Sequence, residues 1–520
     1  MARNNRMSAA IGAHQRAVAI APDHPDSHLT LARALRDQHR FREAAESFRR
    51  VIKLRPSDLQ AQIGLGAMLH QAGELSAATE AYVRALQLKP DCAEAFTNLG
   101  LVCQDLGDFA LAVELQRQAI AVAPGMADAH NNLGSALSKQ GNTEDALACF
   151  RRALALKPDH AGAHYNIGHL FANRGDLMAA ETWYRRALAY KPQSGTLRFY
   201  LGVLHLLQGR FSPGWQEYEF RWGSRHLRDA KRTFSQPQWR GEPLGGDSIL
   251  LYAEQGLGDT MQFVRYAPLV AARGGRVLLE VQAGLRRLIA GMEGWGQVLS
   301  QGDPLPDFRW QCPLMSLPLA FKTELASIPG SVPYLRANDG EVERWSERLQ
   351  GSELRVGVAW AGNSKHPRES MRSIPLAALA PLTAVEGTRF YSLQKGPAAA
   401  QIRGLPSRMM VIDLDAEQKD FADTAAIVAN LDLVISIDTS VAHLAGALGK
   451  PVWVLLHHVP DWRWLLGRED SPWYPTARLF RKSVTEDWQA VVHRLRDEIE
   501  KLAKQTARQD QARTPEGRHP

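Results

Sequence analysis

Six prolines recur at one fixed spacing in the first part of the chain. Each lies 34 residues after the one before it: Pro22, Pro56, Pro90, Pro124, Pro158 and Pro192. The residues ahead of them repeat as well, as in "AESFRRVIKLRP" and "ETWYRRALAYKP". Proline lacks an amide hydrogen and restricts the residue before it, so it ends a helix. A strict period of this length predicts a stack of like units rather than one compact domain.

Small residues recur inside each unit where two helices would cross. The first predicted helix of the units carries Gly66, Gly100, Gly134, Gly168 and Gly202, and the second carries Ala44, Ala78, Ala112, Ala146 and Ala180. We expect the recurring aromatic residues to fill the space between units; they are Phe48, Tyr82, Phe150 and Tyr184. A two-helix unit with this pattern resembles the tetratricopeptide repeat. The resemblance implies an α-helical solenoid of about six units over residues 1–228.

The last unit of the array departs from the pattern. Gly214 stands where other units have alanine, and the segment Gly214–Trp222 is rich in aromatic residues. A terminal repeat has to cover its outer face, so we expect this unit to pack on a following domain. The resemblance implies that the groove of the array binds a protein partner or the acceptor of a reaction. The alternative is a spacer, or a docking face for the second half of the chain.

The periodicity changes after residue 228. Residues 229–245 mix charge, proline and glycine and are expected to form a linker. Short apolar runs then alternate with helical stretches, which predicts parallel sheets covered by helices. The expected strands are SILLYAE, RVLLEV, LRVGVAWAG, RFYSLQKG, MMVIDL, LDLVISI and PVWVLL. We therefore expect an α-solenoid followed by two Rossmann-like α/β lobes, a short one at 246–345 and a second at 350–500, and a disordered tail at 501–520.

Polar clusters fall at the ends of these expected strands, where ligands of open parallel sheets bind. In the stretch AEQGLGDTMQF, Gly258 permits close approach of the backbone and Asp259 opens a helix. A carboxylate at this place could accept a proton from an attacking hydroxyl, an effect worth about 10²–10⁴-fold in rate. The alternative is that Asp259 only caps the helix.

Two lysines follow later expected strands. Lys365 lies in AGNSKHPRESMR, close to Arg368 and Arg372, and Lys395 lies in SLQKGP. Either lysine could neutralise the phosphate of a ligand. The alternative is that both are exposed basic residues on loops.

A third cluster interrupts the apolar stretch VISIDTSVAHLAGALGKPVWVLL. Thr439 and Ser440 fall at the predicted N-terminus of a small-residue helix, whose free amides favour an anion such as a diphosphate. Asp438 would orient the turn or a sugar hydroxyl, and His443 would reach the same side one turn later. The alternative is simple helix capping with His443 satisfied in the core.

Together these clusters resemble those of nucleotide-sugar glycosyltransferases with the two-lobed GT-B fold. In particular they resemble the bacterial heptosyltransferases, glycosyltransferase family 9. The Gly-Asp turn of that family matches Gly258-Asp259, its loop lysine matches Lys365, and its Asp-Thr-Gly-x-x-His motif matches Asp438–His443, with Ser440 in place of glycine. The resemblance implies an inverting transfer without a metal or other cofactor.

The predicted site follows from the residues and this resemblance together. Asp259 is the expected catalytic base, and the expected contacts of a nucleotide diphosphate sugar are Gly258, Lys365, Lys395, Asp438, Thr439, Ser440 and His443. The fusion of tetratricopeptide repeats to a sugar-transferring domain is also similar to the protein O-linked N-acetylglucosamine transferases, family 41. The expected acceptor is thus a hydroxyl on a protein or a glycan.

Aromatic residues crowd the stretch after the last expected strand. Trp462, Trp464, Trp473 and Tyr474 lie there within thirteen residues. They either stack on a base or sugar, or brace the two lobes against each other.

Composition limits the remaining functions. The net charge is +7, but no dense Lys/Arg run with interleaved aromatics is present, so we expect no nucleic-acid partner. Four cysteines without CxxC spacing argue against zinc and against a disulfide framework. No apolar stretch approaches a membrane span, and the N-terminus lacks the features of a signal peptide, so we expect a cytoplasmic enzyme. The rival interpretation is a non-catalytic repeat scaffold whose α/β region has lost its chemistry.

Overall fold

The computed structural model describes residues 2–224, 227–292, 294–351, 353–363, 369–406 and 409–513. The chain divides into two compact units, Met1–Gln193 and Ser194–Pro520. This boundary falls before the sixth helix pair. The solenoid expected over residues 1–228 is therefore divided, and its last helix pair belongs to the same unit as the α/β region.

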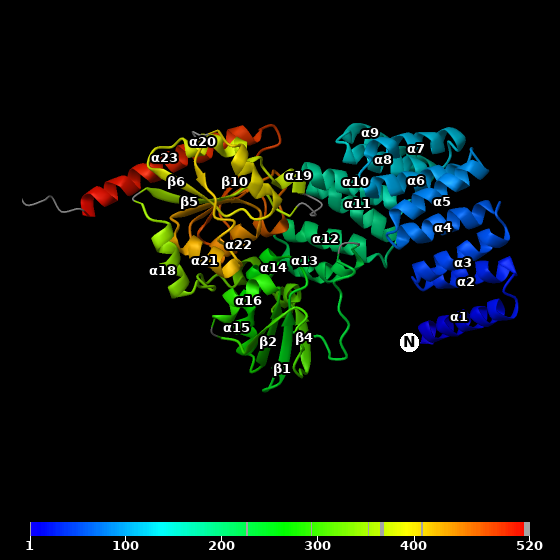
Figure 1. Cartoon of the computed structure of the whole chain (residues 1–520), viewed down its shortest axis with the longest axis horizontal. Helices are drawn as coiled ribbons and strands as arrows, with labels where there is room; N and C mark the ends of the chain where they lie inside the picture. The colour runs from blue at the N-terminus through cyan, green and yellow to red at the C-terminus, as the bar shows by residue number, and fades with distance from the viewer. Residues whose placement is uncertain are drawn as a thin grey trace, which may run out of the picture. The chain divides into compact units, whose positions relative to one another are not determined.

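The first unit is a run of α-helices joined by short turns (Figure 1). Successive helices pair as the 34-residue period predicts, α2 with α3 and α10 with α11 among them. The helices are α1 (Ala2–Ile20), α2 (Pro25–Asp37), α3 (Phe41–Leu54), α4 (Leu59–Gln71), α5 (Leu75–Leu88), α6 (Ala93–Leu106), α7 (Phe109–Val122), α8 (Ala127–Lys139), α9 (Thr143–Leu156), α10 (Ala161–Arg174) and α11 (Leu177–Tyr190).

The recurring glycines allow the paired helices to approach closely. At three of them, an added β carbon would lie about 2.7 Å from the aromatic side chain of the same repeat unit. The pairs are Gly66 with Tyr82, Gly134 with Phe150 and Gly168 with Tyr184. These rings thus pack within their unit, which differs from the expected packing between units. Phe48 does contact the next unit, because its ring lies against Gly64.

A second series of glycines forms the turns between paired helices. Gly73, Gly107, Gly141, Gly175 and Gly209 are again 34 residues apart and have φ between +75° and +88°. Side chains with a β carbon are strained in this left-handed region, so glycine recurs here for its backbone freedom.

The second unit begins with α12 (Gly195–Leu207), α13 (Phe211–Tyr218) and the short 3-10 helix η1 (Glu219–Gly223). The segment expected to be a linker does not run free. The amide of Trp239 donates to the carbonyl oxygen of Gln311 at 2.8 Å, and the Trp239 side chain is buried. Residues 237–239 therefore extend along the edge of the first sheet.

That first sheet has four parallel strands in the order β3-β2-β1-β4. The strands are β1 (Ser248–Tyr252), β2 (Arg276–Val281), β3 (Gln297–Ser300) and β4 (Trp310–Pro313). Its helices are α14 (Leu257–Phe263), η2 (Val264–Tyr266), α15 (Ala267–Ala271), α16 (Ala283–Ala290), η3 (Leu314–Ser316), α17 (Leu317–Ala320) and η4 (Leu325–Ser327). We call this part the first lobe.

The second sheet has six parallel strands in the order β10-β9-β8-β5-β6-β7, and we call its region the second lobe. The strands are β5 (Leu354–Ala359), β6 (Thr388–Ser392), β7 (Val411–Ile412), β8 (Leu433–Ile437), β9 (Val452–Leu456) and β10 (Ala477–Arg481). Its helices are α18 (Asp339–Arg348), α19 (Glu369–Arg372), η5 (Leu376–Leu379), α20 (Ala380–Thr383), η6 (Pro397–Gly404), α21 (Phe421–Asn430), α22 (Ser440–Ala447), η7 (Trp462–Trp464) and α23 (Trp488–Arg513). Counted from β5, this is the strand order of doubly wound nucleotide-binding sheets.

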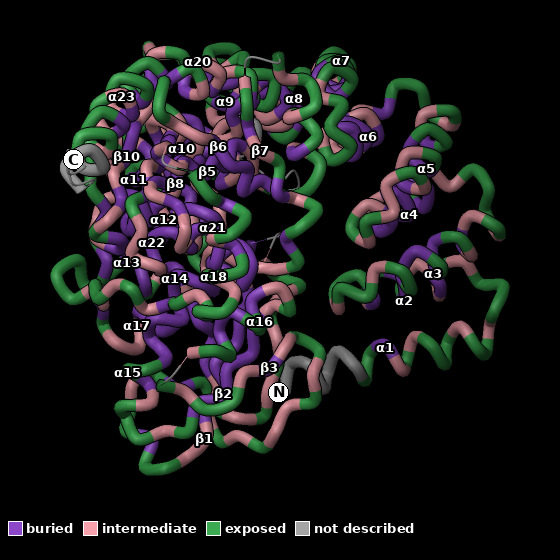
Figure 2. Tube along the Cα trace, turned by 60° about the vertical axis from the view of Figure 1, so that its left-hand side comes forward, coloured by how far each residue is buried: buried purple, intermediate pink, exposed green. Residues whose placement is uncertain are grey.

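All seven expected strands are present, and all but the two-residue β7 are buried along most of their length (Figure 2). Strands β3, β4 and β10 were not among the expected ones. Two boundaries also differ. Helix α18 packs on α21, so the first lobe ends before Asp339 rather than at 345. Helix α23 runs to Arg513, so residues 501–513 of the expected disordered tail are helical, whereas 514–520 lie outside the described residues.

Candidate functional site

The order of each sheet reverses at one point, and the polar turns follow the strands on either side of it. In the second lobe the reversal lies between β5 and β8, and in the first lobe between β1 and β4. Loops leave such a pair of strands in opposite directions, which opens a crevice at their C-terminal ends. Asp259 follows β1 and Asp438 follows β8. Helices α14 and α22, which follow these two strands, pack against each other.

The turn after β8 leads into the N-terminus of α22. Strand β8 is buried at every residue, and Thr439 caps α22 by accepting a hydrogen bond from the amide of Val441 at 3.3 Å. The Thr439 hydroxyl also shares a hydrogen bond with Ser436, at 3.1 Å. The capping alternative is thus correct for Thr439. Ser440 is partly exposed at the first turn of α22, and the described residues offer its amide no partner.

The loop after β5 contacts the same turn. Arg372 donates to the carbonyl oxygen of Asp438 at 3.1 Å and pairs with Glu369 at 2.9 Å. Glu369 in turn accepts from the amide of Gly362 at 2.7 Å. A guanidinium therefore stands between the loops of β5 and β8, where the strand order reverses. Lys365 lies in this loop but outside the described residues.

His443 is held by aromatic side chains of the second lobe. Its ring is buried, its Nδ1 shares a hydrogen bond with the hydroxyl of Tyr474 at 2.8 Å, and Trp464 stacks on it. A β carbon on Gly258 would lie 2.7 Å from Cδ2 of this ring. The predicted donor contacts Gly258 and His443 therefore touch each other, and they hold α14 against α22. His443 is thus buried in this contact, whereas Gly258 is partly exposed, and their role in donor binding stays a prediction.

Burial also shifts the pKa of His443 and of the neighbouring Asp438. Desolvation and the nearby Arg463 lower the pKa of His443 to about 3, so the imidazole is neutral at pH 7. Its Nε2 lies 3.9 Å from Oδ1 of Asp438, but a neutral ring forms no ion pair there. Burial, followed by the neighbouring Asp461, raises the pKa of Asp438.

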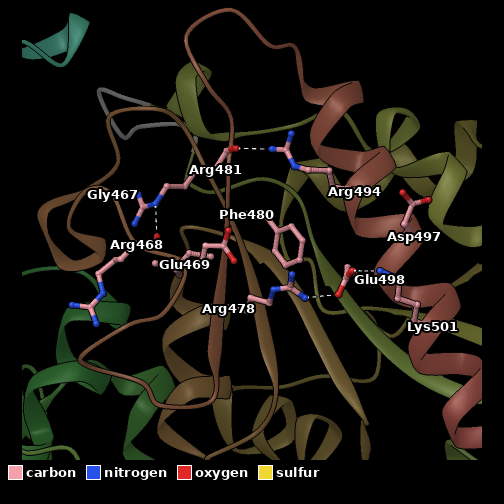
Figure 3. Close-up of a pocket in the computed structure, with 11 residues that line it drawn as sticks. Gly467, Arg468, Glu469, Arg478, Phe480, Arg481, Arg494, Asp497, Glu498 and Lys501 are labelled. Atoms are coloured by element: carbon pink, nitrogen blue, oxygen red, sulfur yellow. Dashed lines mark hydrogen bonds and ion pairs between the residues drawn. The ribbon is translucent and has the colours of Figure 1, made fainter.

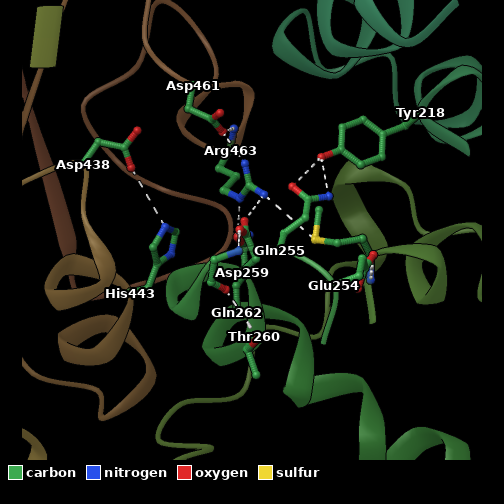
Figure 4. A network of polar contacts seen from close by, with 12 residues as sticks. Tyr218, Glu254, Gln255, Asp259, Thr260, Gln262, Asp438, His443, Asp461 and Arg463 are labelled. Atoms are coloured by element: carbon green, nitrogen blue, oxygen red, sulfur yellow. Dashed lines mark hydrogen bonds and ion pairs between the residues drawn. The ribbon is translucent and has the colours of Figure 1, made fainter. Parts of the chain in front are cut away.

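Asp259 lies at the start of α14 with both carboxylate oxygens engaged (Figure 4). Oδ2 accepts from the amide of Gly256 at 2.8 Å, which is the capping alternative. Oδ1 pairs with the guanidinium of Arg463, which comes from η7 of the second lobe. The side chain of Asp259 keeps 21% of its accessible surface, against 8% for Arg463. The predicted base is thus partly open to solvent but already ion-paired.

A second buried cluster fills the reversal point of the first lobe. Arg221, from η1, is fully buried and donates to Glu219 at 2.7 Å, Glu254 at 3.0 Å and Ser316 at 2.8 Å. Glu254 directly follows β1 and Ser316 follows β4. Desolvation raises the pKa of Glu254 to about 7 even though Arg221 opposes the shift. Its Oε2 has no hydrogen-bond partner in the described residues.

The aromatic stretch braces the lobes rather than forming a stacking surface. Trp462 packs edge-on against Trp215 of α13, with 5.2 Å between the ring centroids, and against Tyr218, with 5.9 Å between the centroids. Trp473 contacts Phe263 of α14 at 5.6 Å. Both tryptophans are buried. Of the two interpretations of this stretch, the structure favours bracing, and the last helix pair of the array takes part in it.

Arg265 completes this brace from the first lobe. It donates to the carbonyl oxygen of Trp473 at 2.9 Å and lies over the ring of Tyr334 at 4.2 Å. The two lobes and the last helix pair are therefore one packed body at this place.

Lys395 does not face the reversal point with a free ammonium. Its Nζ donates to the carbonyl oxygens of Asp415 at 2.7 Å and Gln418 at 2.9 Å, and pairs with the Asp415 carboxylate at 2.7 Å. The ammonium is thus engaged within the loop that follows β7, and phosphate binding by Lys395 stays a prediction.

A hollow of about 510 Å³ lies elsewhere in the second lobe, along edge strand β10 and α23 (Figure 3). Two arginines that line it already have partners. Arg478 donates to the Glu498 carboxylate at 2.6 Å, and Arg481 donates to the carbonyl oxygen of Arg468 at 2.8 Å. Strand β9 separates β10 from β8, so this hollow is distinct from the reversal point.

Sequence reasoning missed Arg463, Arg221 and Glu254 as members of the site. Glu254 could have been found, because it is the last residue of the predicted strand SILLYAE. Arg221 and Arg463 lie 242 positions apart, in a repeat and in an aromatic loop, and no local pattern joins them. Among the described residues, no group of His, Cys, Asp and Glu side chains is arranged to hold a metal ion, and no helix is long and apolar enough to cross a membrane.

Comparison with known proteins supports the repeat array. Models described as tetratricopeptide repeat match residues 29–93, 131–194 and 165–212, and another matches 91–159. Protein FlbA of Caulobacter vibrioides is 29% identical over 332 residues, which cover 56% of this chain and 52% of FlbA. The chain thus spans about half the length of that relative.

Similar solved structures include MamA, at 26% identity, with a TM-score of 0.28 over 31% of this chain and 93% of MamA. A thermophilic tetratricopeptide-repeat protein of Thermus thermophilus, TTC0263, is 23% identical, with a TM-score of 0.33 over 35% of this chain and all of that one. The family matches show that the N-terminal helical array, up to about residue 210, consists of tetratricopeptide repeats.

Proposed function

We propose that the α/β region is a metal-independent, inverting glycosyltransferase of the GT-B class. It moves a sugar from a nucleotide diphosphate donor to the hydroxyl of an acceptor, and the repeats bind the acceptor or a protein partner. The observation that carries the proposal is the coincidence of polar turns with strand-order reversal in both sheets. In each sheet the turn after a strand at the reversal carries the predicted aspartate, and the helices that follow meet at Gly258 and His443.

The donor side is the second lobe. The partial positive charge of the α22 N-terminus, the free amide and hydroxyl of Ser440, and the guanidinium of Arg372 favour a diphosphate. Lys365 belongs to the same proposal through the family resemblance. Thr439 and Asp438 shape the turn, and Asp438 is left to meet a sugar hydroxyl.

The acceptor side is the first lobe. The acceptor oxygen attacks the anomeric carbon on the face opposite the diphosphate, and a new carbon–oxygen bond forms while the bond to the phosphate oxygen breaks. The diphosphate leaves with the bonding electron pair, and Asp259 takes the proton of the acceptor hydroxyl. Positioned groups of this kind need no metal for that step. The four cysteines are unpaired, which fits the reducing, cytoplasmic setting that we propose.

The test begins with a calorimetric titration of the full chain with UDP, GDP, ADP, CDP and dTDP. We expect one of them to bind, and the corresponding nucleotide sugars are then tried as donors with candidate peptide and glycan acceptors. With a donor identified, Asp259→Asn should retain nucleotide binding and lose transfer by a factor of about 10² or more. Unchanged transfer by that variant would remove Asp259 from the mechanism.

A second function is favoured by one observation. Both oxygens of Asp259 are already bound, one of them by Arg463, as in a structural ion pair. On this interpretation the protein is a non-catalytic scaffold that binds partners through its repeats. Absence of binding to all five nucleotides would support the scaffold and contradict the transferase.

A further inference from the structure

The guanidinium of Arg463 is a cation placed in the middle of the proposed site. It comes from η7 of the second lobe and is almost fully buried. Its Nη2 pairs with Asp259, its Nη1 with Asp461 at 2.7 Å, and its Nε donates to Gln262 at 2.9 Å. Trp462 covers one face of the guanidinium at 4.2 Å. Figure 4 shows Arg463 between Asp461 and Asp259.

Two of these contacts cross from one lobe to the other. Asp259 and Gln262 belong to α14 of the first lobe, whereas Asp461 shares the loop of Arg463. Nη2 of the guanidinium thus holds the proposed base, while Asp461 of its own lobe holds Nη1. Arginine binds carboxylates and phosphates through the same pair of N–H groups, so the two kinds of anion compete for it.

We propose that Arg463 is a binding residue for the diphosphate of the donor, and that it pairs with Asp259 only until the donor arrives. This inference rests on the proposed transferase function and assigns to it an order of events. Without a donor, Arg463 occupies Oδ1 of Asp259, so the acceptor hydroxyl finds the proton acceptor engaged. The incoming diphosphate binds Nη2 of Arg463, and Oδ1 of Asp259 becomes available. Donor binding therefore precedes productive acceptor binding.

The competition makes a prediction that a purely structural ion pair does not make. If Arg463 has to leave Asp259 in order to bind phosphate, removal of the Asp259 charge strengthens diphosphate binding. Simple repulsion between Asp259 and the ligand would also strengthen it, but that effect does not need Arg463. The two explanations separate when both side chains are changed together.

The experiment uses inorganic pyrophosphate as the probe and the full chain, with binding followed by calorimetry. Arg463→Gln should weaken pyrophosphate binding about tenfold or more, since hydrogen bonds to charged groups are of that size. Arg287→Gln is the matched control. Arg287 also joins the lobes, pairing with Asp420 at 2.9 Å and Asp423 at 3.0 Å, but it lies on α16, and its partners lie at the start of α21 rather than at the polar turns. This control should bind pyrophosphate as the unchanged protein does.

Asp259→Asn supplies the second half of the test, because it leaves Arg463 with Asp461 and Gln262 and does not strand a charge. It should bind pyrophosphate about threefold to tenfold more tightly than the unchanged protein. In the Arg463→Gln background, Asp259→Asn should give no such gain. A gain of equal size in that background, or unchanged binding by Arg463→Gln, would overturn the role of Arg463 while leaving the transferase proposal intact. Failure of the unchanged protein to bind pyrophosphate or any nucleoside diphosphate would overturn both.

Discussion

Arg221 offers the sharpest test of how the repeat array and the α/β region are joined. The substitution Arg221→Met keeps most of the volume and removes the charge. Arg221 has no exposed surface, and Glu254, one of its two acidic partners, is 1% exposed on its side chain. Removing one member of a buried ion pair typically costs about 3–5 kcal/mol, because the other member is left buried and unpaired. We expect a loss of that size in the free energy of unfolding at pH 8.

The loss should depend on pH in a definite direction. The pKa of Glu254 is about 7 with Arg221 in place, and removal of the cation raises it further. At pH 5 the Glu254 carboxyl of the variant is therefore protonated and leaves no buried charge. The destabilisation should be smaller at pH 5 than at pH 8. The double variant with Glu254→Gln should recover much of the loss at pH 8, since the stranded carboxylate is then absent.

Urea unfolding, monitored by tryptophan fluorescence, reports on the second unit, which contains Arg221. Twelve of the thirteen tryptophans follow residue 193, and Trp183 is the exception, so the signal comes from the second unit. A cost below about 1 kcal/mol at pH 8 would refute the reasoning, because it would place Arg221 among weak surface pairs. An equal loss in the single and double variants would refute it as well.

Three further predictions address other parts of the structure. The first concerns pH. Between pH 4.5 and 7 the folded chain holds a proton on Glu254 that the unfolded chain releases. The free energy of unfolding of the unchanged protein should therefore fall by about 3 kcal/mol relative to that of Glu254→Gln as the pH rises through that window, measured by urea unfolding at both ends. A chain starting at Ser194 should unfold cooperatively by circular dichroism, whereas one starting at Asp229 lacks Trp215 and Arg221 and should not; equal behaviour of the two would contradict the domain boundary. Gly258→Ala should force α14 away from the ring of His443 and lower the unfolding free energy by about 1–3 kcal/mol, and an unchanged value would show that the ring can move aside.

The parts of the fold that repeat or alternate could be predicted from the sequence. The 34-residue period located the helix pairs, since each proline and each turn glycine has a local backbone reason. Strands such as β5 and β8 were visible because buried parallel strands are continuous apolar runs. Strands β4 and β10 were not, since WQCP and ARLFR carry polar residues at the sheet edges. The C-terminal limit of α23 was also missed, because its last turns are polar throughout.

The candidate site, like the fold, could be predicted only in part. Its location could be predicted, because polar residues after apolar strands share one edge of a sheet. The roles of single residues could not, since they depend on partners far away in the chain. Lys395 binds the loop after β7, His443 meets Gly258 from the other lobe, and Asp259 meets Arg463. Such long-range pairings leave no spacing or periodicity to read.

The position of the domain boundary inside the repeat array has a consequence for how such chains vary in length. The pair α12–α13 and the η1 helix after it are packed into the α/β body, through Trp215, Tyr218 and Arg221. The units before residue 194 contribute none of these contacts. Insertion or deletion of whole 34-residue modules upstream of Ser194 would therefore lengthen or shorten the helical array and leave these contacts of Trp215, Tyr218 and Arg221 unaltered.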